Sequence, residues 1–110
     1  MDDPDVPQEV REDRLFTHWI CFNISPDTQD ISEGEQVGIL GANTHGNARY
    51  TGPCPPVGYI PNEHRYFFRL YALDVILDFE GGASREKIEV AMKSHIIAQA
   101  QIIGLYKQPQ

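Results

Sequence analysis

Alternating apolar and polar positions predict three strands separated by polar loops. In residues 15–24, apolar side chains fall on both faces of an extended chain, which favours a central strand over a half-exposed one. Residues 64–74 predict a second strand of the same kind, with more aromatic side chains. A shorter strand is predicted within residues 37–46, before a turn rich in glycine and asparagine. Residues 1–14 and 25–36 are polar and predict loops.

The spacing of apolar residues becomes helical after the Gly81-Gly82 break. Ser84 can cap a helix N-terminus, and apolar side chains recur after it at intervals of three and four residues. This spacing predicts an amphipathic helix over residues 85–100. A last short strand is predicted over residues 102–106. The pattern as a whole predicts a mainly β fold with one late amphipathic helix.

Size and composition predict one globular domain. The chain has 110 residues, of which 41% are hydrophobic and 23% charged, so it can build one core and not two. Residues 1–110 are therefore expected to form a single domain. No apolar run approaches the roughly 20 residues of a membrane span, and no signal peptide is visible. Two cysteines, Cys21 and Cys54, fit a reduced cytoplasmic protein better than a disulfide framework, although one disulfide stays open.

Acidic side chains are concentrated at the start of the chain. Residues 1–36 hold ten Asp and Glu against two Arg, whereas the remainder holds six against seven Lys and Arg. The plainest interpretation is a solvated acidic segment, and the sharper one is that a few of these acids line a site. The net charge of −7 disfavours a nucleic-acid partner, because Lys and Arg are what neutralise a phosphate backbone.

Four polar side chains could carry chemistry, because each lies beside a proline-stiffened turn or on an apolar strand. They are Asp3, Asp5, His18 and His64. Each has a plainer interpretation alone: a histidine on an apolar face is usually hydrogen-bonded in the core, and an aspartate before proline usually forms a turn. Residues 52–56 must form an ordered loop, because three prolines in four positions can join neither a sheet nor a helix.

In this order, the motifs resemble the phosphatidylethanolamine-binding protein family, in its bacterial and archaeal Raf-kinase-inhibitor-like branch. The five motifs are Asp-Pro-Asp-Val-Pro at 3–7, Phe-Thr-His-Trp at 16–19 with Phe-Asn-Ile at 22–24, Gly-Pro-Cys-Pro-Pro at 52–56 with His-Arg-Tyr at 64–66, Leu-Tyr-Ala-Leu-Asp at 70–74, and Ser-His-Ile-Ile-Ala at 94–98. The resemblance implies a β-sandwich with a large central sheet and a peripheral helix. Relatives carry a few dozen residues before the first motif, so the resemblance also implies that the N-terminal strands are missing here and that a sheet edge is exposed.

The resemblance further implies a shallow anion pocket, which in the family takes phosphate, acetate or a phosphoethanolamine headgroup. The positions that correspond to its lining are Asp3, Pro7, His18, Gly52, Cys54, Pro56, His64 and Tyr66, with Asp5 in close support. The residue types suit this chemistry, because imidazoles donate to phosphate oxygens and a neighbouring carboxylate fixes the histidine tautomer. A zwitterion fits best, with its phosphate at the histidines and its ammonium at the aspartate. Prolines would limit the entropy lost on binding.

We therefore expect a binding and regulatory module for a small anionic or zwitterionic ligand, with no cofactor and no catalytic residue. Family members inhibit kinases or serine proteases or act as signalling scaffolds, so such a protein partner is left open, as is a homodimer. The main alternative is a metal-dependent hydrolase that uses Asp3, Asp5, His18 and His64, although no His-x-x-x-His or paired-cysteine spacing supports it. A nucleophilic Cys54, and a fragment that keeps the motifs without holding the pocket, are the remaining readings.

Overall fold

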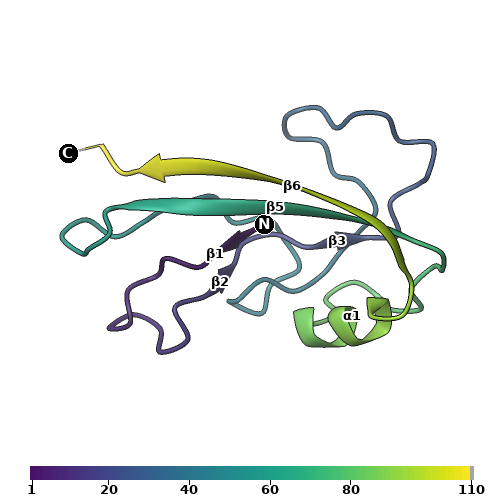
Figure 1. Ribbon diagram of the computed structural model, residues 1–110, viewed down its shortest axis with the longest axis horizontal. Helices are drawn as coiled ribbons and strands as arrows, with labels where there is room; N and C mark the ends of the chain where they lie inside the picture. Colours follow the sequence, from purple (N-terminus) through teal and green to yellow (C-terminus); the bar gives the residue numbers. More distant parts are fainter. Residues whose placement is uncertain (110) are drawn as a thin grey trace.

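The computed structural model describes residues 1–109, which form an antiparallel sheet with one short helix at its end (Figure 1). The elements are β1 (Asp2–Asp3), β2 (Phe16–Thr17), β3 (Cys21–Phe22), β4 (Ile39–Leu40), β5 (Glu63–Leu73), α1 (Arg85–Met92) and β6 (Ile96–Lys107). Four strands make one sheet in the order β2-β1-β5-β6, and β3 and β4 make a second sheet of two strands. The predicted mainly β fold with one late helix is confirmed.

Strand β5 is the centre of the larger sheet. It pairs with β1 on one side and with β6 on the other, from Glu63 opposite Lys107 to Leu73 opposite Ile96. Its aromatic side chains, such as Phe67 and Phe68, favour this extended, half-buried environment. The strand predicted over residues 64–74 is therefore confirmed, with neighbours on both sides. The short strand predicted within the segment before the glycine-rich turn is also present, as β4.

The continuous strand predicted over residues 15–24 is wrong. The segment divides into β2, which pairs with β1, and β3, which pairs with β4 in the other sheet. Residues 18–20 lie between the two strands and belong to neither. Their backbone bonds to loops instead: the carbonyl of His18 accepts a hydrogen bond from Thr51 N at 3.0 Å. Alternation along the chain cannot reveal such a change of sheet, because the chain stays extended through it.

The helix predicted over residues 85–100 ends at Met92 instead. Its start is as predicted, because the side chain of Ser84 caps it. The following segment pairs with β5 from Ile96 onward, so that the short strand predicted over residues 102–106 is only the end of β6. Four isoleucines in β6 favour a strand, and the long register with β5 outweighs the local helical spacing.

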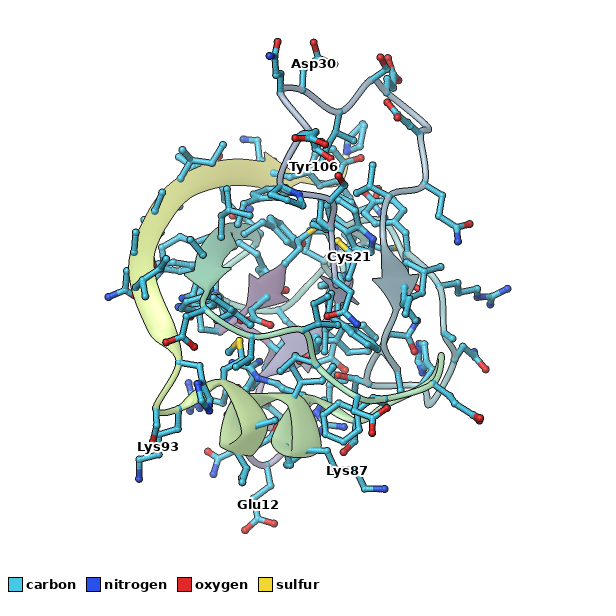
Figure 2. The ribbon with its side chains drawn as sticks, turned by 90° about the vertical axis from the view of Figure 1, so that its right-hand side faces the viewer. Glu12, Cys21, Asp30, Lys87, Lys93 and Tyr106 are labelled. Atoms are coloured by element: carbon cyan, nitrogen blue, oxygen red, sulfur yellow. The ribbon has the colours of Figure 1, made fainter. Side chains whose placement is uncertain are left out.

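A small core lies between α1 and the two-stranded sheet. Its buried members are Phe22, Leu77 and Ile88, and partly buried side chains such as Phe79 pack around them. The opposite side of the helix faces solvent, and Figure 2 shows Lys87 pointing outward from it. The helix is thus amphipathic, as predicted, and covers only one end of the sheet.

The described residues bear on two further expectations, which concern a possible disulfide and a membrane span. Cys21 and Cys54 are both free thiols, so the disulfide that the sequence left open does not form between them. Burial raises the pKa of the Cys21 thiol. Within residues 1–109, no helix has the length and apolar character needed to cross a membrane.

Candidate functional site

Pairing of β1 with β5 brings Asp3 and His64 together across 61 positions of sequence. The Asp3 Oδ2 to His64 Nδ1 distance is 2.6 Å, and the His64 ring is only 1% exposed. The second oxygen of Asp3 accepts a hydrogen bond from Asp5 N at 2.8 Å, which fixes the carboxylate within its turn. A buried imidazole held by a carboxylate in this way has a fixed orientation and a proton on the nitrogen that faces the carboxylate.

The second nitrogen of His64 is also engaged. Its Nε2 lies 3.1 Å from the carbonyl oxygen of Pro61. Carboxylate and carbonyl oxygens only accept hydrogen bonds, so both contacts are hydrogen bonds at once only when the ring carries two protons. His64 therefore has no nitrogen left over unless the contact with Pro61 opens.

His18 lies on the other side of the site and has a different set of contacts. Its Nδ1 is 2.8 Å from the carbonyl oxygen of Thr51, the residue just before the proline-rich loop. Burial lowers the pKa of His18, which favours the neutral ring. Because Nδ1–H donates to the carbonyl, the neutral ring presents Nε2 as an acceptor. This nitrogen has no hydrogen-bond partner within residues 1–109.

Tyr66 lies between the two histidines. Its ring centroid is 5.4 Å from that of His18, edge on, and 6.4 Å from that of His64, stacked. Tyr66 is 2% exposed, and its hydroxyl is buried without a hydrogen-bond partner among the residues described. Burial and the nearby Asp3 carboxylate raise its pKa, so the hydroxyl keeps its proton. An unsatisfied buried hydroxyl costs about 1–3 kcal/mol, which makes this group the strongest indication of a ligand position.

Asp5, which is predicted to support the site closely, forms hydrogen bonds with Arg65. The Arg65 Nε and Nη2 atoms lie 2.9 and 2.8 Å from the Asp5 carboxylate oxygens, and the Arg65 backbone N–H adds a third hydrogen bond. These hydrogen bonds hold the pKa of Asp5 below its ordinary value. Of the two aspartates in the first motif, Asp3 is the one that contacts a histidine.

The remaining predicted lining residues lie in the loops around this cluster. Pro7 is buried, Gly52 and Pro56 are half-buried, and Cys54 is exposed. The sulfur of Cys54 accepts a hydrogen bond from the Gln108 side chain at 2.9 Å. Among the described residues, no hydrogen bond joins these four to His18, His64 or Tyr66, so their part in the site stays a prediction.

Asn43 supports the site, although the sequence pattern indicated only a short strand and a glycine- and asparagine-rich turn in this region. Its buried side chain donates hydrogen bonds to the carbonyl of Arg49 and to Oγ1 of Thr51, at 3.1 and 3.0 Å, and accepts one from Asn47 N at 3.1 Å. Asn43 thereby fixes the turn that holds Thr51, whose carbonyl orients His18. The only sign in the sequence was an asparagine in a turn, which is too common to single out.

A third imidazole lies at the edge of the cluster. His45 packs edge on against Phe16 with ring centroids 5.0 Å apart, and Phe16 in turn lies 4.5 Å from His18. His45 is exposed, so it belongs to the rim of the site and not to its buried part. Sequence reasoning did not select it, because it falls in the same glycine- and asparagine-rich turn.

The four residues of the hydrolase alternative are divided between separate contacts. Asp3 pairs with His64, Asp5 pairs with Arg65, and His18 bonds to a backbone carbonyl. Within residues 1–109, no three His, Cys, Asp or Glu side chains lie together in a way that could hold a metal ion. The cluster offers instead one hydroxyl donor, one imidazole acceptor and one imidazole already bonded on both sides.

Comparison with known proteins identifies the family of the chain. Residues 1–107 match the model of the phosphatidylethanolamine-binding protein family. A UPF0098 protein of Chlamydia muridarum is 46% identical over 109 residues, which are 98% of this chain and 70% of that protein. A UPF0098 protein of Methanothermobacter thermautotrophicus is 45% identical over 114 residues, covering 97% of this chain and 70% of that protein. Both relatives are therefore longer than the region they share with this chain.

Two solved structures have the same fold. CT736 of Chlamydia trachomatis, described as a phosphatidylethanolamine-binding protein homologue, superposes with a TM-score of 0.91 at 46% identity, covering 98% of this chain and 69% of that one. YbcL of Escherichia coli superposes with a TM-score of 0.79 at 24% identity, covering 98% and 68%, and supports the fold alone. With the family model matched over nearly the whole chain, the protein belongs to the phosphatidylethanolamine-binding protein family.

Proposed function

We propose that this chain is a binding module for a small phosphate-bearing anion or zwitterion, such as phosphate or phosphoethanolamine. Membership in the family supports a binding module in general. The observation that carries the specific proposal is the Tyr66 hydroxyl, which is buried, lacks a partner in the described residues and belongs to a ring that packs against two imidazoles. A ligand oxygen at this position would accept the hydrogen bond that the protein leaves unmade.

The contacts of the two histidines indicate what kind of ligand suits the site. His18 presents an acceptor nitrogen, which needs a hydrogen on the ligand, from an ammonium or from a protonated phosphate. The buried Asp3 carboxylate, which is already hydrogen-bonded to His64, would repel a dianion placed against it. A zwitterion or a singly charged phosphate satisfies both conditions. In this proposal Asp3, Pro7, Gly52, Cys54 and Pro56 line the site and Asp5 supports it from outside.

The wider role follows the family and is likewise a proposal. We expect the chain to act by binding and not by catalysis, in the cytoplasm, with a kinase or a serine protease as the candidate protein partner. A metal-dependent hydrolase is the weaker candidate, because the two aspartates it would use are already paired, with His64 and with Arg65. Metal analysis of the purified protein would distinguish the two: a stoichiometric metal that is lost in His64→Ala would favour the hydrolase.

Isothermal titration calorimetry with phosphoethanolamine, phosphate and ethanolamine tests the proposed ligand class. We expect the two phosphate compounds to bind and ethanolamine alone to fail, with phosphoethanolamine the tighter of the two. His18→Ala should weaken binding, whereas His95→Ala should not, because His95 pairs with Asp74 outside the cluster. Folded wild-type protein that binds neither phosphate compound, even at tens of millimolar, would contradict the proposal.

A further inference from the structure

The carbonyl oxygen of Pro61 occupies the one nitrogen of His64 that a ligand could reach. Asp3 holds Nδ1 at 2.6 Å, so Nε2 is the only ring nitrogen that remains, and Pro61 O lies 3.1 Å from it. A carbonyl oxygen and a phosphate oxygen are both hydrogen-bond acceptors, so they would compete for the same N–H. In the absence of ligand, the protein therefore supplies its own acceptor to His64.

The segment that carries this carbonyl is weakly attached. Residues 57–62, called here the 57–62 loop, lie just before β5 and form no helix or strand. All six residues are exposed, and Ile60 is 94% exposed. Among the residues that the structure describes, the contact between Pro61 and His64 is the one hydrogen bond that ties this loop to the rest of the molecule. The loop can therefore move away without breaking other hydrogen bonds of the fold.

We propose that the 57–62 loop is a gate for the site, closed when Pro61 bonds to His64 and opened by a ligand that takes its place. The gate rests on the proposed function, because it regulates that same site. Two groups, the buried Tyr66 hydroxyl and His18 Nε2, have no hydrogen-bond partner among the described residues and would bond to the ligand once the gate opens. An anionic oxygen then replaces the neutral carbonyl at His64, and hydrogen bonds to charged groups are roughly twice as strong as neutral ones.

Closure of the gate should lower the apparent affinity for ligand. A site that is competent in only part of the population binds more weakly by that fraction. Pro61→Gly should weaken closure, since glycine gives the open loop more conformational freedom that closing must remove. We expect this variant to bind phosphoethanolamine roughly 3- to 10-fold more tightly than wild type. Pro26→Gly is the matched control, because Pro26 lies in a different exposed loop, and it should bind like wild type.

A measurement without ligand tests the closed state by itself. In spectra of the ¹⁵N-labelled imidazoles, the wild-type His64 Nε2–H should exchange slowly with water, because Pro61 and burial protect it. Pro61→Gly should speed this exchange and leave Nδ1–H, which is held by Asp3, unchanged. Equal Nε2–H exchange in the two proteins would overturn the gate without bearing on whether the site binds ligand.

The binding outcomes separate the gate from the proposed function. Tighter binding by Pro61→Gly, with wild type also binding, supports the gate. Equal or weaker binding by Pro61→Gly, with wild type still binding, overturns the gate and leaves the proposed function standing. If neither protein binds either phosphate compound, the proposed function fails and the ligand-opened gate fails with it. Circular dichroism and thermal melting would establish that both variants are folded.

Discussion

Tyr66 brings a hydroxyl into the interior of the protein on a ring beside two imidazoles, and within residues 1–109 no group meets it with good hydrogen-bond geometry, although the Asp3 carboxylate is near enough to add to the effect of burial in raising its pKa. In the ligand-free fold this hydroxyl lowers stability, because a phenylalanine would fill the same space without an unsatisfied polar group. Its position is understandable if a ligand accepts its hydrogen bond. The effect of the hydroxyl on stability and its effect on ligand binding can be measured separately.

Tyr66→Phe should leave the stability of the ligand-free protein unchanged or raise it by about 1 kcal/mol, because the variant removes an unsatisfied buried group. The same variant should bind phosphoethanolamine about tenfold more weakly, because the ligand loses a hydrogen bond. Chemical denaturation and calorimetry in one buffer measure both effects. Tyr71→Phe, at a residue two positions from the end of β5, is the control and should change neither. A destabilised Tyr66→Phe with full affinity would show that the hydroxyl has a structural partner.

Burial lowers the pKa of His18, so the unfolded chain takes up a proton on this ring more readily than the folded protein does. The stability that neutral His18 contributes is therefore present above the unfolded pKa of about 6.5 and is lost as the pH falls below it. We expect the free energy of unfolding to decrease between pH 7.5 and 5.5, and to decrease less in His18→Gln. Denaturation with urea at both pH values measures this difference. An equal decrease in the two proteins would mean that other groups account for it.

The candidate residues of the site were predictable, but several of their contacts were not. Residue type and motif order selected His18, His64 and Tyr66, and the structure brings these three rings together. The sequence could not show that Arg65 would form an ion pair with Asp5, or that the Pro61 carbonyl would bond to His64. Both contacts depend on how loops are placed. Hydrogen bonds made by loop backbone leave no periodic pattern in a sequence.

Among the elements, the quality of each prediction depended on whether local pattern and tertiary pairing agreed. They agree in β5, where an aromatic run lies between two neighbouring strands. They disagree after Met92, where residues spaced like a helix are drawn into β6 by pairing with β5. The prediction of one strand over the segment that contains β2 and β3 was wrong for a related reason. The chain stays extended there, but β2 belongs to one sheet and β3 to the other.

Helix α1 packs its core face against the two-stranded sheet and is joined to the large sheet by an ion pair. Arg85 donates hydrogen bonds to Asp2 at 2.7 Å and to Thr17 at 3.0 Å, and the buried Asp2 also receives one from Arg69 at 2.6 Å. Removing one partner of a mostly buried carboxylate leaves its charge less well compensated. The helix should therefore depend on Arg85 more than on the charged residues of its outer side.

Arg85→Ala should lower the free energy of unfolding by about 1–3 kcal/mol, because Asp2 then keeps only Arg69. Lys87→Ala, at a helix residue that points outward in Figure 2, should lower it by less than about 0.5 kcal/mol. Equilibrium denaturation with urea measures both changes. Similar values for the two variants would show that the ion pair with Asp2 does not hold the helix.

At the scale of the whole molecule, β6 presents an open edge. It pairs with β5 on one side only, and its apolar side chains include Ile97 and Ile102, which are 68% and 72% exposed. The relatives that match this chain are longer, and the shared region is about 70% of their length. An exposed apolar strand with unpaired backbone groups favours association with another strand.

The 110-residue chain should therefore self-associate through β6, which is our proposal for the homodimer that the sequence left open. The double variant Ile97→Lys and Ile102→Lys should shift the protein toward monomer in sedimentation velocity at micromolar concentration, because charges at an edge oppose strand pairing. Val90→Lys, at an exposed apolar residue of α1, is the control and should leave the association unchanged. A wild-type chain that remains monomeric, or a double variant that associates equally, would refute association through this strand.

The convergence of His18, His64 and Tyr66 on one ligand is tested most directly by following the imidazole ¹⁵N resonances of all four histidines during a titration with phosphoethanolamine. The resonances of His18 and His64 should move together along a single binding curve, while those of His95, held by Asp74 away from the cluster, stay in place. Resonances of His18 and His64 that do not move at saturating ligand, or that follow two unrelated curves, would contradict a shared site.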